Sequence, residues 1–89
     1  MLSEIPIDLD KVRKEDIDKE IMRLAMIAEL DATNLYESMA SLTEDRKLST
    51  VLLDVAREEK VHVAMFQTVL MEVDPEYLKI LADYALVKK

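Results

Sequence analysis

Apolar residues recur every three or four positions along most of this chain, which is the spacing of one side of an α-helix. One such run starts at residue 10 or 14 and continues to about residue 41, and a second covers about residues 44–73. The main apolar side of the first run consists of Ile17, Ile21, Leu24, Ala28, Leu35 and Met39. That of the second run consists of Leu48, Leu52, Val55, Phe66, Val69 and Val73. A shorter third run ends near residue 87 and has Tyr77, Leu81 and Tyr84 or Ala85 on one side.

Two short segments separate these predicted helices. Leu42–Asp45 is a tight connection, in which Thr43 is the expected N-cap of the second helix. Asp74 and Pro75 form the sharpest break, because aspartate caps a helix and proline suits its first position. Two helices of about 42–45 Å joined by so short a loop must lie antiparallel. The expected fold is all-α: an N-terminal arm (residues 1–10), then a domain (residues 11–89) made of an antiparallel two-helix hairpin and a short C-terminal helix.

Three polar residues interrupt the apolar sides of the two long helices. Glu59 and His62 stand in the middle of the second apolar run, and their spacing of three puts them on adjacent turns of one side. Glu29 interrupts a neighbouring run on the first helix, and alanines precede and follow it on that run. The members of this run are Met22, Ala25, Glu29, Ala32, Tyr36 and Met39. Because an unpaired buried carboxylate costs several kcal/mol, a compensating partner is expected, and a metal cation is one such partner.

The hairpin geometry predicts that these three residues lie at the same position along the hairpin axis. In an antiparallel pair whose connection is centred near residue 44, residues equally distant from that centre face each other. Glu29 and Glu59 are both fifteen residues from it, and His62 falls opposite Ala25. The sequence therefore predicts a cluster of two carboxylates and one imidazole.

Composition narrows the chemistry of that cluster. The chain has no cysteine, so disulfides, thiolate zinc sites and iron–sulfur clusters are excluded. Glu58 precedes Glu59 and there is no second histidine, which excludes a His-Glu-x-x-His zinc peptidase. The net charge of −7 disfavours nucleic acid and attracts cations. No apolar stretch is long enough to span a membrane and no basic segment precedes a signal-like core, so the expected location is cytoplasmic.

The number of candidate ligands is half the number found in a known type of metal centre. Ferritin-like di-iron bundles use one Glu from each of two helices and a Glu-x-x-His from each of the other two. This chain has one of each, Glu29 and Glu59–His62. Carboxylates with imidazole suit iron or manganese. A hairpin of 89 residues also buries little surface alone. We therefore expect an obligate homodimer that forms a four-helix bundle and binds iron (Fe²⁺/Fe³⁺), two ions per dimer.

Two segments resemble the encapsulated ferritin family, which includes ferritin-like domains fused to encapsulin shell proteins. The segments are Leu24–Glu37 and Leu52–Ala64, and the likeness extends over about residues 13–84. The resemblance implies a ferroxidase centre with Glu29, Glu59 and His62 as metal ligands and catalytic residues.

The same resemblance implies further properties of the site and the assembly. It implies that Tyr36 lies close to the centre as a further catalytic residue. It also implies a ring of dimers and an encapsulin shell protein as partner, so that oxidised iron is stored or detoxified inside a nanocompartment in the cytoplasm. Free-standing cargo members end in a short shell-targeting tail, which Leu86–Lys89 does not match. Either the chain is the isolated domain of a fusion, or the implied link to a shell does not hold.

Several alternatives stay open at this point. The site could act as a rubrerythrin-like peroxide reductase, which would need a separate electron donor, or the chain could be a non-catalytic dimeric helical adaptor with a buried polar network. Glu29 could pair with Lys60 or Arg57 of a partner, and His62 could be an ordinary core histidine. Tyr36 could tune the metal or simply pack. Asp31 and Glu37 could guide cations or only face water, and the methionines are expected to fill the core.

Overall fold

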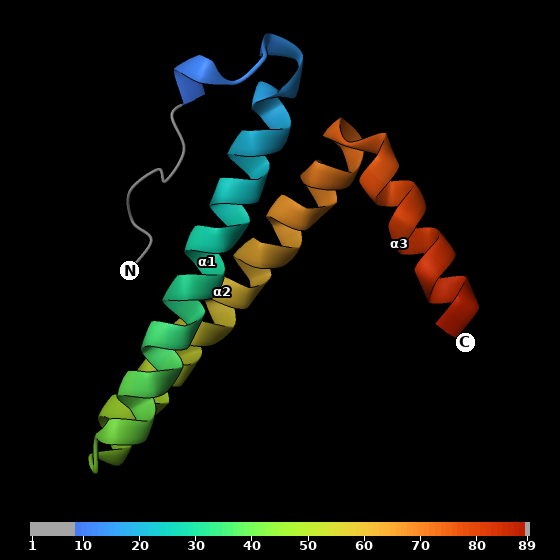
Figure 1. The fold of residues 1–89 in the computed structure, drawn as a ribbon. Coiled ribbons are helices and arrows are strands. Elements are labelled where there is room, and N and C mark those ends of the chain that lie inside the picture. Colours follow the sequence, from blue (N-terminus) through green and yellow to red (C-terminus); the bar gives the residue numbers. More distant parts are fainter. Residues whose placement is uncertain (1–8, 89) are drawn as a thin grey trace.

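The computed structural model describes residues 9–88, and every helix in this range fits the predicted all-α class (Figure 1). Two single 3₁₀ turns, Leu9–Lys11 and Lys14–Asp16, precede three α-helices. These helices are α1 (Ile17–Leu42), α2 (Arg46–Val73) and α3 (Pro75–Lys88). Most of the predicted N-terminal arm, residues 1–8, lies outside the described residues. No helix within residues 9–88 is long and apolar enough to cross a membrane.

The first long helix begins later than its apolar pattern predicts. We expected a start at residue 10 or 14, but α1 begins at Ile17. Arg13 is extended (φ −60°, ψ 142°), and the following residues form a 3₁₀ turn closed by the Asp16 amide donating to the Arg13 carbonyl at 2.9 Å. The guanidinium of Arg13 also pairs with the Glu15 carboxylate. These local contacts compete with the first α-helical turns, so the predicted start was wrong by about one to two turns.

The loop between the long helices has a different cap from the one predicted. The Asp45 carboxylate accepts hydrogen bonds from the amides of Lys47 (2.8 Å) and Leu48 (3.2 Å), so Asp45 is the N-cap of α2. Thr43 instead ends α1, where its amide donates to the Met39 carbonyl. Both residues are good cap formers, but Asp45 stands immediately before the first helical residue. The prediction of Thr43 as N-cap was therefore wrong.

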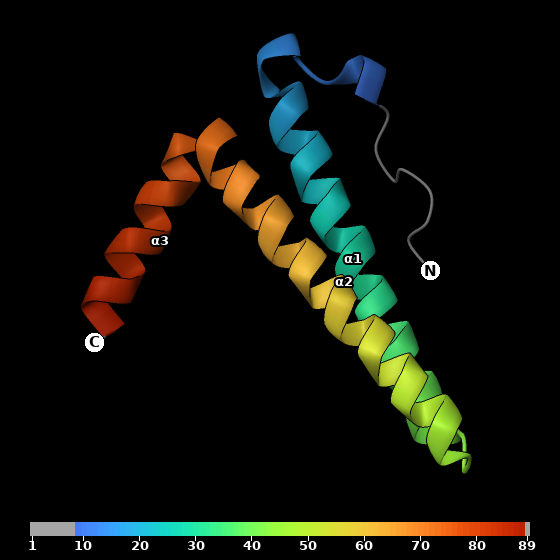
Figure 2. The ribbon, with the colours of Figure 1, turned by 180° about the vertical axis from the view of Figure 1, so that it is seen from behind.

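The two long helices lie antiparallel along their lengths (Figures 1 and 2). Positions alternately three and four apart form the seam between them, and all are buried or half-buried. On α1 the seam consists of Met22, Met26, Glu29, Thr33, Tyr36 and Ala40. On α2 it consists of Leu52, Ala56, Glu59, Val63, Phe66 and Leu70. Among the described residues the buried core is small, and its apolar members are Ala40, Ala56 and Leu70.

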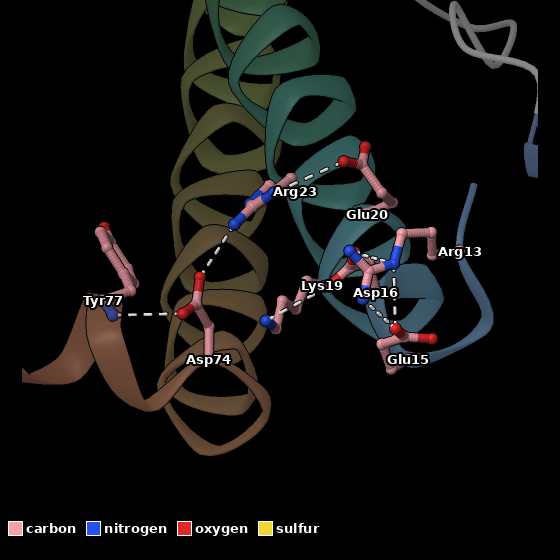
Figure 3. Close-up of polar contacts among 8 residues, drawn as sticks. All are labelled: Arg13, Glu15, Asp16, Lys19, Glu20, Arg23, Asp74 and Tyr77. Carbon is pink, nitrogen blue, oxygen red and sulfur yellow. Dashed lines mark hydrogen bonds and ion pairs between the residues drawn. The ribbon is translucent and has the colours of Figure 1, made fainter.

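The third helix begins at the break predicted between Asp74 and Pro75. Asp74 closes α2 and caps α3, because its amide donates to the Leu70 carbonyl and its carboxylate accepts from the Tyr77 amide at 3.2 Å. Its other carboxylate oxygen lies 2.9 Å from the Nη2 atom of Arg23 on α1 (Figure 3). Burial raises the pKa of the Asp74 carboxyl, but the Tyr77 amide and the Arg23 guanidinium outweigh burial and hold that pKa below its ordinary value.

The result is a thin molecule with the third helix turned away from the hairpin (Figure 2). Its principal extents are 47 × 40 × 16 Å, and the smallest of these is not much more than the thickness of one helix, about 10–12 Å. A helical domain needs at least two packed layers to enclose a core. The described part of the chain therefore forms a single layer of helices.

Candidate metal centre

Glu29, Glu59 and His62 converge midway along the hairpin. Glu29 lies near the middle of α1, while Glu59 and His62 lie on adjacent turns of α2. The Nδ1 atom of His62 is 3.4 Å from Oε2 of Glu29 and 3.6 Å from Oε2 of Glu59. One ligand atom from each residue lies within 4.8 Å of the other two. Since oxygen and nitrogen ligands bind at about 2.0–2.2 Å, opposite ligands of one ion lie about 4 Å apart, and small side-chain movements would reach this spacing.

The three side chains differ in exposure. The carboxylates belong to the seam and are 21% (Glu29) and 19% (Glu59) exposed, whereas the imidazole of His62 is 46% exposed. His62 therefore stands at the edge of the seam, where the hairpin meets its surroundings. An ion at this site would be held from the inside by carboxylates and from the outside by an imidazole.

One carboxylate oxygen of the cluster lacks a hydrogen bond. Oε2 of Glu29 is buried and accepts none within the described part of the chain. The ion pairs of Lys60 and Arg57 go to Glu37 and Asp54, so neither basic residue neutralises Glu29 within the chain. Its nearest basic group is Nδ1 of His62 at 3.4 Å, and a buried charged oxygen that accepts no hydrogen bond is costly. The donor set and this unsatisfied atom fit a divalent cation.

The face that carries His62 is apolar and uncovered. We call it the ligand face, and it consists of residues three or four apart beside the seam on both helices. Its members on α1 are Ile21, Ala25, Ala28, Ala32, Leu35, Met39 and Leu42, and those on α2 are Leu48, Val51, Val55, Glu58, His62, Met65 and Val69, of which only Glu58 and His62 are polar. Leu42 is 81% exposed, Met65 58% and Val51 55%. Such a large exposed apolar surface is typical of an interaction site.

Comparisons with known proteins show the family and the fold of this chain. The family model described as Rubrerythrin matches residues 20–87. The chain belongs to the rubrerythrin family. The crystal structure of the encapsulated ferritin domain from Pyrococcus furiosus is similar with a TM-score of 0.76 and 50% sequence identity, covering 88% of this chain and 80% of that one. The resemblance to encapsulated ferritins that the two sequence segments predicted is confirmed.

Two curated relatives of this rubrerythrin-family chain are longer than it. The ferritin-like-encapsulin shell fusion protein of Pyrococcus furiosus is 54% identical over 70 residues, which are 79% of this chain and 20% of that protein. The encapsulin nanocompartment cargo protein EncC of Myxococcus xanthus is 38% identical over 55 residues, which are 62% of this chain and 42% of that protein. The chain thus spans about a fifth of the first relative and less than half of the second.

The remaining predicted site residues have different environments. Tyr36 lies on the seam two turns after Glu29 and is half-buried, and its role stays a prediction. Glu37 forms an ion pair of 2.7 Å with Lys60 across the hairpin. Glu58 is exposed on the ligand face, four residues before His62. Asp31 is half-buried, and its predicted role in guiding cations is untested.

Sequence reasoning missed a supporting contact at Glu29. Thr33 is 6% exposed, and its hydroxyl donates to the Glu29 main-chain carbonyl at 2.9 Å. This bond reaches back one turn of α1 and satisfies the Thr33 hydroxyl inside the seam. The spacing of four residues was visible in the sequence, but threonine hydroxyls form such bonds in many helices, so the signal was not specific.

Proposed function

We propose that this rubrerythrin-family chain is a ferroxidase, which oxidises Fe²⁺ to Fe³⁺ at a two-iron site formed across a homodimer. The observation that carries the proposal is the cluster of Glu29, Glu59 and His62, whose ligand atoms lie within 4.8 Å of one another beside an uncovered apolar face. Iron is the substrate in this reaction. Each pair of Fe²⁺ ions gives two electrons to oxygen or peroxide.

The residues of the chain have distinct roles in this proposal. The carboxylates of Glu29 and Glu59 bind iron in the seam, and the unsatisfied Oε2 atom of Glu29 gains a partner. His62 presents its Nδ1 atom to the same point and completes the set from one chain. Negatively charged ligands stabilise a trivalent ion more than a divalent one. The site therefore favours the oxidised product.

The dimer follows from ligand number and from exposed surface. Three ligand atoms leave an octahedral ion incomplete, whereas two chains would give four carboxylates and two imidazoles, the full set of a di-iron bundle. Placing the ligand face of one chain on that of another would cover Leu48, Val51 and Val69, which are 40–55% exposed in the single chain. It would also form the second layer that the thin hairpin lacks.

The names of the two relatives support a compartment for the product. One is fused to an encapsulin shell and the other is cargo of an encapsulin nanocompartment. We extend this to the present chain and propose an encapsulin shell protein as its partner, with a cytoplasmic compartment in which ferric iron is stored. The hairpin has no internal volume for mineral, so a separate container fits a protein of this shape.

Anaerobic titration of the metal-free protein with Fe²⁺ tests the site. We expect iron binding to saturate at about one ion per chain. Tight binding should be lost in Glu59→Ala and in His62→Ala. Glu72→Ala is the matched control, because it removes an exposed carboxylate of α2 that is ten residues from His62, and this variant should bind iron normally. When oxygen is then admitted, the iron-loaded parent protein should form Fe³⁺ faster than the two ligand variants. Absence of tight binding would contradict the proposal.

A second function is favoured by the family match itself. The matching family is described as Rubrerythrin, and the same ligands would serve a peroxide reductase that receives electrons from a separate protein. Sustained peroxide consumption with an external reductant, without accumulation of ferric product, would favour this alternative. Iron-dependent oxygen consumption with ferric product would favour the ferroxidase.

A further inference from the structure

One methionine near the metal centre differs from the others in exposure. Met22, Met26, Met39 and Met71 are half-buried, as expected for methionines that fill gaps in a core. Met65 is 58% exposed. The expectation that methionines fill the core does not describe Met65 in the single chain.

Met65 is also placed beside a ligand. It follows His62 by three residues on α2, so the two side chains lie on the same side of the helix, with Cβ atoms about 5–6 Å apart. Both belong to the ligand face, which the proposed dimer would close over the metal centre. The chain has no cysteine, so the thioethers of its methionines are its only sulfur groups. Within one turn of His62 on α2, Met65 is therefore the group most easily oxidised by a peroxide.

We propose that Met65 is an oxidation site that protects the metal ligands from hydrogen peroxide formed at the centre. This inference rests on the proposed ferroxidase function, since oxygen that accepts two electrons from two Fe²⁺ ions and two protons becomes hydrogen peroxide. The thioether sulfur of Met65 attacks one peroxide oxygen, a sulfur–oxygen bond forms and the oxygen–oxygen bond breaks. Sulfur loses two electrons to become a sulfoxide, and the second oxygen leaves as water with both protons.

The position of Met65 explains why it would react before Tyr36. Tyr36 is half-buried in the seam, whereas Met65 stands on the ligand face, toward the surface that a second chain would cover. A dimer would confine peroxide that leaves the carboxylates to this interface, next to the thioether. A leucine or isoleucine would pack equally well on an apolar face but could not accept the oxygen atom.

The test uses the complete 89-residue protein during aerobic turnover of added Fe²⁺, with catalase present to remove peroxide from bulk solution. Two quantities are measured together: the rate of Fe³⁺ formation and the sulfoxide content of each methionine by peptide mass spectrometry. Met71 is the internal control, because it lies on the same helix but is half-buried on the other side of the seam. Iron-free protein treated with hydrogen peroxide gives the ratio of Met65 to Met71 oxidation that exposure alone produces.

We expect iron turnover to raise the Met65 to Met71 sulfoxide ratio severalfold above the iron-free ratio. Met65→Leu keeps volume and apolar character, so it should bind iron and dimerise normally but lose activity after fewer turnovers, with oxygen adducts at His62 or Tyr36. Normal Fe³⁺ formation with an unchanged ratio, or a Met65→Leu protein that lasts as long as the parent, would overturn this inference alone. Absence of Fe³⁺ formation would overturn the ferroxidase function and this inference with it.

Discussion

The two faces of the hairpin come from the same two helices but differ in the contacts that their side chains make. On the ligand face, apolar side chains such as Val51 and Met65 remain exposed around His62. On the opposite face, which we call the bridged face, ion pairs join elements of the fold: Glu37 with Lys60, and Arg23 with Asp74. The bridged face also exposes apolar side chains such as Leu30 (49%) and Leu53 (48%), but ion pairs tie it together within one chain. The ligand face combines its apolar surface with the candidate ligand His62. This difference supports our proposal that a second copy covers the ligand face.

The largest expected effect comes from placing a charge on the ligand face. Val51→Glu would bury a carboxylate against apolar residues of a second chain, at a cost of about 3 kcal/mol or more, which weakens the dimer about a hundredfold. Analytical ultracentrifugation over a concentration series measures this. The matched control is Leu53→Glu, because Leu53 is 48% exposed, close to the 55% of Val51, but points toward the bridged face. Equal dimerisation of Val51→Glu and the parent protein would remove the distinction between the faces.

A smaller effect is expected from neutralising the unsatisfied carboxylate. Glu29→Gln removes a buried charge whose Oε2 atom accepts no hydrogen bond in the described structure, so the metal-free protein should be stabilised by about 1–3 kcal/mol. Added Fe²⁺ or Mn²⁺ should raise the melting temperature of the parent but not of the variant. Thermal unfolding followed by circular dichroism under anaerobic conditions measures both. If the metal-free Glu29→Gln protein is less stable than the parent, the Glu29 carboxylate stabilises the packing of α1 against α2 and is not a metal ligand.

The Arg23–Asp74 contact should make the bridged face sensitive to acid. The pKa of Asp74 in the folded chain lies below its ordinary value, so the charged carboxylate stabilises the fold above the unfolded-state pKa, and this contribution is lost as pH falls through the folded pKa. We expect Asp74→Asn to lower the free energy of unfolding at neutral pH and to have less effect at the lowest pH. Urea unfolding at a series of pH values checks this. An equal destabilisation at every pH would show that the charge on Asp74 does not stabilise the fold.

The smallest effect should come from the exposed ion pair. The side chains of Lys60 and Glu37 are 59% and 41% exposed, and pairs of this kind contribute about 0.2–1 kcal/mol. Lys60→Met should therefore change urea stability only slightly and leave iron stoichiometry unchanged, although Lys60 adjoins Glu59. A large loss of iron binding in Lys60→Met would show that the bridged face positions the ligands. In that case the two faces could not be treated as independent.

Much of the fold and the candidate site could be predicted because the relevant signals are periodic. A spacing of three or four residues identified the long helices, and equal distance from the connection placed Glu29 opposite Glu59. The ends of the helices were predicted less well, because neighbouring residues compete to cap or start a helix. Thr43 and Asp45 are both capping residues, and only the backbone path between the helices decided that Asp45 caps α2. Likewise, the early contacts of Arg13 delayed the start of α1 beyond its apolar pattern.

The sequence by itself determined the helical class, the hairpin and the identity of the three clustered residues, because each depends on spacing along one chain. Only the tertiary structure decided how far each helix is rotated about its axis. That rotation put Glu29 and Glu59 into the seam, left His62 at its edge and exposed Met65. Rotation depends on how side chains of the facing helices pack together, notably around Ala40, Ala56 and Leu70, and such contacts join residues far apart in the chain.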